Sequence, residues 1–225
     1  MSGPLDTTPR CSSERTRHPE ASPFAHALVV GGTGMLRGVS RWLAARSAAV
    51  TVTGRRAERL VPLADEFANL APVAFDWRDA DAARRSVEHA LKTRGPCDLA
   101  VLWVHDSGAR ALDAIVETLV AHADAASSTV RLVHVLGSSA DDPNAFADDA
   151  KPELLRREAP PRSVRYEQVV LGFMIEDPPR GGGGSGVSRW LTNDEISAGV
   201  IDAIERPSIR TTVGLTRPWG RRPGM

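Results

Sequence analysis

The stretch that decides the fold is residues 28–38, which read LVVGGTGMLRG. An apolar strand sequence runs directly into a glycine-rich turn, and an amphipathic helix with Val39, Trp42 and Leu43 follows. Glycines let a backbone turn sharply and approach a pyrophosphate closely, while free N–H groups at a helix start stabilise its charge. The candidate phosphate-binding residues of this turn are Gly31, Gly32, Thr33, Gly34, Met35 and Leu36.

The spacing of this turn departs from the usual dinucleotide fingerprint. Gly31 and Gly34 stand three residues apart, and Arg37 occupies the place where a third glycine is expected, with Gly38 after it. A plain structural turn is therefore the alternative interpretation. The order strand, glycine turn, amphipathic helix favours the binding function.

Short apolar runs alternate with helical stretches for more than a hundred residues after this turn. The runs predict strands over residues 27–30, 49–53, 73–75, 98–104, 130–136 and 163–174. The clearest helix carries an apolar stripe from Leu112 to Ala123. This pattern is typical of an α/β protein with one Rossmann-like, doubly wound parallel sheet, and we expect a single domain over residues 25–215.

The flanking and connecting segments look different. Residues 1–24 lack the apolar stretch of a secretory signal and predict a disordered extension, while residues 216–225 indicate a solvated, arginine-rich tail. Residues 141–162 and 181–186 are rich in Pro, Asp, Arg or Gly and predict loops.

A last helix is predicted after these loops. It begins near Thr192, whose hydroxyl forms a capping box with Glu195, and Pro207 ends it.

Composition limits the classes of partner. Lys plus Arg and Asp plus Glu both number 28, so no overall basic field attracts nucleic acid or an anionic membrane. No apolar run approaches the roughly 20 residues that cross a bilayer. The cysteines, Cys11 and Cys97, form neither a disulfide framework nor a metal-ligand pattern. We expect a soluble, cytoplasmic protein that binds no metal.

With its Gly-Gly-Thr-Gly turn, the chain resembles divergent, atypical members of the short-chain dehydrogenase/reductase superfamily over about residues 25–204. The resemblance implies a Rossmann sheet, a nicotinamide cofactor along the carboxyl edges of the strands, and reductase chemistry. It also implies a possible homo-oligomer, with a dimer face built from the last helix and residues 169–175.

The end of the second strand favours NADP(H) over NAD(H). The strand is followed by Arg55 and Arg56, where an NAD-binding protein carries an acid for the ribose hydroxyls. An arginine accepts the 2′-phosphate of NADP through charge-assisted hydrogen bonds. The same position disfavours an S-adenosylmethionine site, which also wants an acid. The alternative is that both arginines only begin a solvated helix.

Further cofactor contacts follow from the resemblance. Asp76 and Trp77, after the third strand, match the residues that hold the adenine edge, although Asp76 alternatively caps the helix that starts near Asp79. Val104 ends the fourth strand and is followed by His105, where the family often has an Asn-Ala-Gly sequence under the nicotinamide.

The catalytic set matches the family only in part. Ser138 and Ser139 follow the fifth strand, where the family's serine hydrogen-bonds a substrate carbonyl, although a plain loop is equally compatible. The single tyrosine, Tyr166, has Val170 four residues on in place of the family's lysine, so we expect it to be structural. His105 is the other candidate, as a proton donor, or alternatively as a residue that only lines the crevice.

These residues predict an NADP(H)-dependent oxidoreductase acting on a small carbonyl or alcohol, with Ser138 and His105 as catalytic candidates. The missing Tyr-Lys pair supports an alternative, a non-catalytic NADP(H)-binding or sensing module. A third possibility is a vestigial loop that binds no cofactor.

Overall fold

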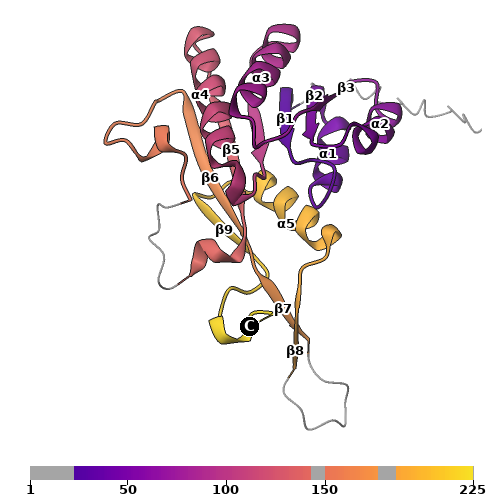
Figure 1. Ribbon diagram of the computed structural model, residues 1–225, viewed down its shortest axis with the longest axis vertical. Coiled ribbons are helices and arrows are strands. Elements are labelled where there is room, and N and C mark those ends of the chain that lie inside the picture. Colours follow the sequence, from indigo (N-terminus) through magenta and orange to yellow (C-terminus); the bar gives the residue numbers. More distant parts are fainter. Residues whose placement is uncertain (1–22, 143–149, 177–185, 225) are drawn as a thin grey trace, which may run out of the picture.

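The computed structural model describes residues 23–142, 150–176 and 186–224. Its main sheet has seven parallel strands in the order β3-β2-β1-β4-β5-β6-β9 (Figure 1). The strands are β1 (Phe24–Val30), β2 (Ser47–Gly54), β3 (Leu70–Ala74), β4 (Leu99–Leu102), β5 (Val130–Leu136), β6 (Val164–Leu171) and β9 (Arg210–Val213). The predicted Rossmann-like sheet is confirmed. The strand order reverses between β1 and β4, where such sheets open a crevice at the carboxyl ends.

Helices cover both faces of the sheet. They are α1 (Arg37–Ala44), α2 (Ala57–Glu66), α3 (Ala80–Arg94), α4 (Ala109–Ala125) and α5 (Asn193–Glu205). One core packs α1, α2 and α5 on one face, and the other packs α3 and α4 on the opposite face. Successive residues of β1 alternate between the two cores, because side chains alternate across a strand.

The strand predicted over residues 163–174 is interrupted. β6 ends at Leu171, and after Gly172 the chain enters β7 (Phe173–Glu176), which pairs antiparallel with β8 (Val187–Trp190). The break lies at Gly172, where a Cβ atom would be only 2.1 Å from the carbonyl oxygen of Leu215. The β7–β8 hairpin projects away from the sheet (Figure 1). Part of the predicted 181–186 loop lies outside the described residues.

The connection from β5 to β6 contains no long helix in its described part. It carries only two short 3₁₀ turns, Ser138–Asp141 and Glu153–Arg156. The second turn is held against α4, because the N–H of Glu153 donates to Asp113 Oδ1 at 2.8 Å. The predicted loop character of residues 141–162 agrees with this finding, and residues 143–149 lie outside the described residues.

The end of the described chain packs on the hairpin (Figure 1). The guanidinium of Arg221 donates to the carbonyl of Gly186, and that of Arg222 lies over the rings of Trp190 and Trp219. Residues 216–224 therefore differ from the solvated tail that the sequence indicated. The predicted extension over residues 1–24 lies almost wholly outside the described residues, with β1 beginning at Phe24.

The capping box of α5 is confirmed. Thr192 Oγ1 accepts from the N–H of Glu195 at 3.2 Å, and Glu195 Oε2 accepts from the N–H of Thr192 at 2.8 Å. Residues 169–171, part of the implied dimer face, are buried within the chain itself. Within the described part, no helix has the length and apolarity to cross a membrane.

Candidate functional site

The turn between β1 and α1 is held by its neighbours on three sides. The N–H groups of Gly31 and Gly32 both donate to the carbonyl of Thr53 in β2, at 3.2 and 3.1 Å. Ser40 in α1 donates to the carbonyl of Gly32 at 2.9 Å, and Ser197 in α5 donates to that of Met35 at 2.8 Å. These bonds fix the loop without using the remaining N–H groups.

Those remaining donors have no partner among the described residues. They are the N–H groups of Thr33, Gly34, Met35 and Leu36. Leu36 precedes α1 without a side-chain cap, and the first turn of the helix carries no acid. Free N–H groups at the positive end of a helix dipole form an anion site.

The glycines of the turn have different roles. Gly31 has a positive φ of 79°, and a Cβ there would lie 2.7 Å from the carbonyl oxygen of Trp103. A Cβ on Gly32 would lie 2.4 Å from Ser40 Oγ, so this glycine is required by packing. By contrast, no atom lies within 4 Å of a Cβ on Gly34. Gly34 therefore borders open space beside the free N–H groups of the turn.

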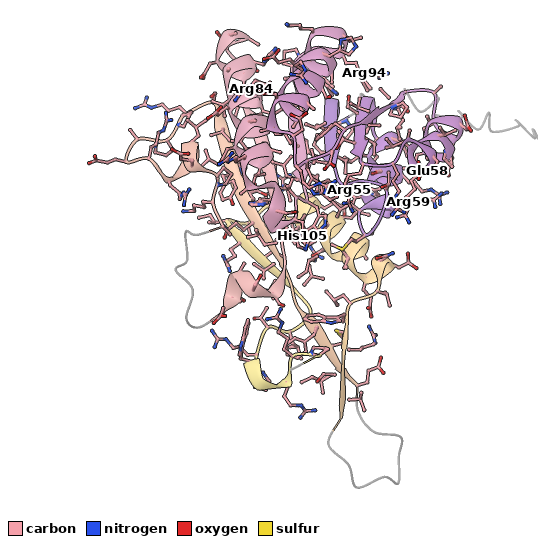
Figure 2. All side chains as sticks on the ribbon, viewed as in Figure 1. Arg55, Glu58, Arg59, Arg84, Arg94 and His105 are labelled. Carbon is pink, nitrogen blue, oxygen red and sulfur yellow. The ribbon has the colours of Figure 1, made fainter. Side chains whose placement is uncertain are left out.

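A cavity of about 190 Å³ lies beside these donors, and we call it the loop cavity. Arg55, Arg56 and Arg59 line it together with Trp77 and the turn. The guanidinium of Arg55 lies 4.2 Å from the ring centroid of Trp77. Figure 2 shows Arg55 and Arg59 where β2 leads into α2, and His105 at the same end of the sheet.

The loop cavity is electropositive. Among the described residues, none of the arginines that line it forms an ion pair. The nearby Asp76 is held by Arg78, whose Nε and Nη2 lie 3.0 and 2.6 Å from Asp76 Oδ2, and these hydrogen bonds lower the pKa of Asp76 to about 2.

The sequence offered two roles for Asp76, and the structure excludes the one as the cap of α3. The N-cap of α3 is Asp79, which accepts from the N–H of Ala82 at 2.9 Å. Trp77 lines the loop cavity, and Asp76 does not. Contact of either residue with a cofactor stays a prediction.

A second cavity, of about 310 Å³, adjoins the first, and we call it the serine cavity. It is lined by Ser138, Ser139 and Gly172 at the ends of β5 and β6. Met35 and Trp103 line both cavities. The two cavities therefore lie side by side at the carboxyl ends of the parallel strands, and we call them together the trough.

His105 lies in a different place. Together with Val104, it lines a third cavity of about 320 Å³ between α4, β5 and the Glu153–Arg156 turn, which also contains His134. The structure thus separates His105 and Val104 from Ser138, which the sequence had grouped at one site. The described residues contain no group of three or more His, Cys, Asp or Glu side chains that could hold a metal.

Tyr166 lies outside the trough. Its Oη is 2.9 Å from His134 Nδ1 and accepts from Gln168 Nε2 at 3.2 Å. Burial lowers the pKa of His134 to about 4, so the imidazole is neutral at pH 7. Tyr166 belongs to a partly buried hydrogen-bond network between β5 and β6.

Several site residues were not singled out from the sequence. Trp103 lies inside the predicted fourth strand, and only its place at the strand's end marks it. Arg59 follows the predicted arginine pair by one helical turn, which is a usable signal. Trp190 lies between the predicted 181–186 loop and the last helix, and Arg222 lies in the predicted tail. No sequence signal brought either residue to the site.

Comparisons with known proteins agree on the fold. No protein-family model and no curated protein matches the sequence. The structure of a short-chain type dehydrogenase/reductase from Mycobacterium marinum superposes with a TM-score of 0.62 at 16% identity, covering 84% of this chain and 93% of that one.

The fold is also similar to that of solved complexes with NADP and with NAD. A metagenomic short-chain oxidoreductase in complex with NADP has a TM-score of 0.55 at 20% identity, covering 85% of this chain and 96% of its own. An NADH-dependent reductase complexed with NAD has a TM-score of 0.58 at 16% identity, covering 85% and 94%. The chain therefore has the fold of short-chain dehydrogenases/reductases, while its activity depends on the chemistry of its own site.

Proposed function

We propose that the chain binds NADP(H) in the trough and acts as an oxidoreductase on a small carbonyl or alcohol substrate. The observation that carries this proposal is the trough itself. Unpartnered N–H groups and arginines line its loop cavity, and a serine at the end of β5 lines its serine cavity.

The preference for NADP(H) rests on charge. Arg55, Arg56 and Arg59 surround a cavity beside the N–H cradle of the turn. A 2′-phosphate there gains charge-assisted hydrogen bonds, whereas the ribose hydroxyls of NAD(H) leave the cations unpaired. The residues present therefore fit the phosphorylated dinucleotide.

Ser138 is the residue that we propose to hold the substrate. Its side chain is 4% exposed and lines the serine cavity, where its hydroxyl can donate to a carbonyl oxygen. When bound, the nicotinamide supplies or accepts a hydride. His105 remains our candidate proton donor, although the cavity that it lines shares no residue with the serine cavity.

The test is NADPH oxidation, followed by its absorbance, with a panel of small aldehydes and ketones. We expect Ser138→Ala to lower kcat/KM by about a hundredfold to a thousandfold, as for loss of an oxyanion donor. The matched control is Ser86→Ala on α3, which lies outside the trough and should retain full activity. His105→Ala tests the role of His105 as proton donor. If both Ser138→Ala and His105→Ala retained full activity, neither residue would have its proposed catalytic role.

A second candidate function is cofactor binding without turnover. It is favoured by the position of Tyr166, which is hydrogen-bonded to His134 away from the trough, and by the lack of a long helix in the described part of the β5–β6 connection. NADPH binding that persists without oxidation across the whole panel supports this candidate.

A further inference from the structure

The serine cavity is lined by an arginine that the cofactor proposal does not use. Arg222 lines this cavity together with Ser138 and Asn193. Its Cζ atom lies 5.0 Å from the ring centroid of Trp219 and 5.4 Å from that of Trp190. Cation–π contacts with two indole rings hold the charge beside the cavity.

No described carboxylate forms an ion pair with Arg222. Glu176 of β7 and Glu195 of α5 both pair with Arg189, at 2.5 and 2.8 Å. Hydrogen bonds from Arg189 and from Thr192 lower the pKa of Glu195 to about 2, so this acid is fully committed. Arg222 is therefore a cation whose charge no described side chain neutralises.

The rest of the cavity is largely apolar. Leu171, Leu191 and Ile196 form part of its wall, and its volume of about 310 Å³ suits a small molecule. An arginine fork beside apolar walls fits a planar carboxylate, because two parallel N–H···O bonds then form in a site of low polarity. Ser138 and Ser139 place hydroxyl groups in the same cavity.

We propose that the substrate is a small oxo acid, or the corresponding hydroxy acid, whose carboxylate binds Arg222 while its carbonyl oxygen lies at Ser138. The reduction of this substrate rests on the proposed function, whereas binding of its carboxylate to Arg222 does not. In the reduction, the carbonyl carbon gains a hydride from NADPH, the carbonyl electron pair moves to oxygen, and that oxygen takes a proton derived from water. NADPH becomes NADP⁺, and the carboxylate is unchanged.

The experiment is calorimetric titration of the full chain with 2-oxobutanoate, acetoacetate and 4-oxopentanoate, each compared with its methyl ester, with and without saturating NADP⁺. NADP⁺ prevents turnover, so binding alone is measured. We expect at least one acid to bind more tightly than its ester. Arg222→Gln should weaken that acid by about tenfold to a hundredfold and leave the ester unchanged, as for loss of a charge-assisted contact.

Two variants control for structure. Arg46→Gln removes another stacked arginine, whose Cζ lies 4.7 Å from the ring centroid of Trp42 outside the trough, and should leave acid binding unchanged. Arg222→Lys keeps the charge but loses the fork, and should bind the acid with intermediate affinity. Melting temperatures of all variants show whether the fold is retained.

The outcomes separate this inference from the proposed function. Equal binding of acid and ester, or binding of no acid, overturns the inference even if NADP⁺ binds. A weaker NADP⁺ affinity in Arg222→Gln also overturns it, because Arg222 then serves the cofactor. Acid binding that depends on Arg222 without any NADP⁺ binding upholds the carboxylate site and contradicts the proposed cofactor.

Discussion

The guanidinium of Arg55 stacks on the indole of Trp77, with its Cζ 4.2 Å from the ring centroid. This contact fixes a cation at the wall of the loop cavity before any ligand binds, so little side-chain entropy remains to be lost on binding. The neighbouring Arg56 and Arg59 add charge to the same cavity.

Reversing the charge at this position should weaken NADPH binding. We expect Arg55→Asp to lower the NADPH affinity by about tenfold to a hundredfold, because a charge-assisted hydrogen bond is worth about 1.5–3 kcal/mol. The NADH affinity should change less. Fluorescence titration of both cofactors measures the difference, with Arg46→Asp as the control for a stacked arginine outside the trough. Equal losses for NADPH and NADH would contradict the assignment of Arg55 to the 2′-phosphate.

The glycines of the turn offer a test that separates folding from binding. Gly34→Ala places a methyl group where no protein atom lies within 4 Å, so its stability should change by less than about 0.5 kcal/mol. The same methyl enters the space beside the free N–H groups and should reduce cofactor affinity.

Gly32→Ala is the matched contrast. Its Cβ would lie 2.4 Å from Ser40 Oγ and 2.7 Å from a methyl carbon of Val52, and overpacking of this kind costs about 1–3 kcal/mol. Melting curves and NADPH titrations of both variants check the pair. Unimpaired NADPH binding by Gly34→Ala would argue against a phosphate at the turn.

The glycine turn and the strands around it could be predicted from the sequence, because each is marked by residues that are close together in the chain. Strands β1, β2, β4 and β5 are short apolar runs, and buried parallel strands produce that pattern. The glycine turn and Arg55 follow strand ends directly, so the topology alone brings them together.

The serine cavity was less predictable, since it is assembled from distant segments. Arg222 lies over Trp190, which is 32 residues earlier in the chain. No local sequence pattern predicts a contact over that separation. Gly172 breaks the long apolar run because Leu215 crosses there, which only the tertiary structure reveals.

Stability should fall in mild acid through His134. Burial lowers its pKa from 6.5 to about 4, so below pH 6.5 the unfolded chain binds a proton that the folded chain does not. Above pH 6.5 His134 is neutral in both states and does not lower the free energy of unfolding. As the pH falls from 6.5 to about 4, the free energy of unfolding decreases by about 3 kcal/mol through this group. Denaturant unfolding at several pH values between 7.5 and 4.5 measures the decline.

His134→Gln isolates this group, because glutamine keeps a hydrogen-bonding group near Tyr166 but does not titrate. Its unfolding free energy should vary less with pH than that of the unmodified chain. His26, whose pKa burial also lowers, is present in both proteins and cancels in the comparison. Identical pH profiles for the two proteins would show that His134 is not the cause.

A buried ion pair ties β5 to β6 and to the end of α5. Arg131 lies 2.7 Å from Glu167 and donates to the carbonyls of Ala203 and Ile204 at 3.0 and 2.8 Å. The side chains are 15% and 4% exposed. Arg165, whose side chain is largely exposed, also pairs with Glu167, at 2.8 Å. Arg131→Met leaves the buried carboxylate with this exposed partner alone, and we expect it to lower the free energy of unfolding by about 2–3 kcal/mol, less than for a carboxylate left with no partner.

Two comparisons check this prediction by urea denaturation. Adding Glu167→Met to the first change removes the buried carboxylate itself and should restore part of the lost stability. Arg84→Met breaks a pair with Glu117 in which both side chains are 42% exposed, and should cost no more than about 1 kcal/mol. If Arg131→Met and Arg84→Met lowered the free energy of unfolding equally, burial would not determine how much the Arg131–Glu167 pair contributes to stability.

The central claim, that the trough holds NADP(H), is tested most directly by calorimetric titration of the purified full chain with NADPH and, in parallel, with NADH. The account predicts that NADPH binds with one-to-one stoichiometry and about tenfold to a hundredfold more tightly than NADH. Tighter binding of NADH, or no heat of binding with either cofactor, would contradict it.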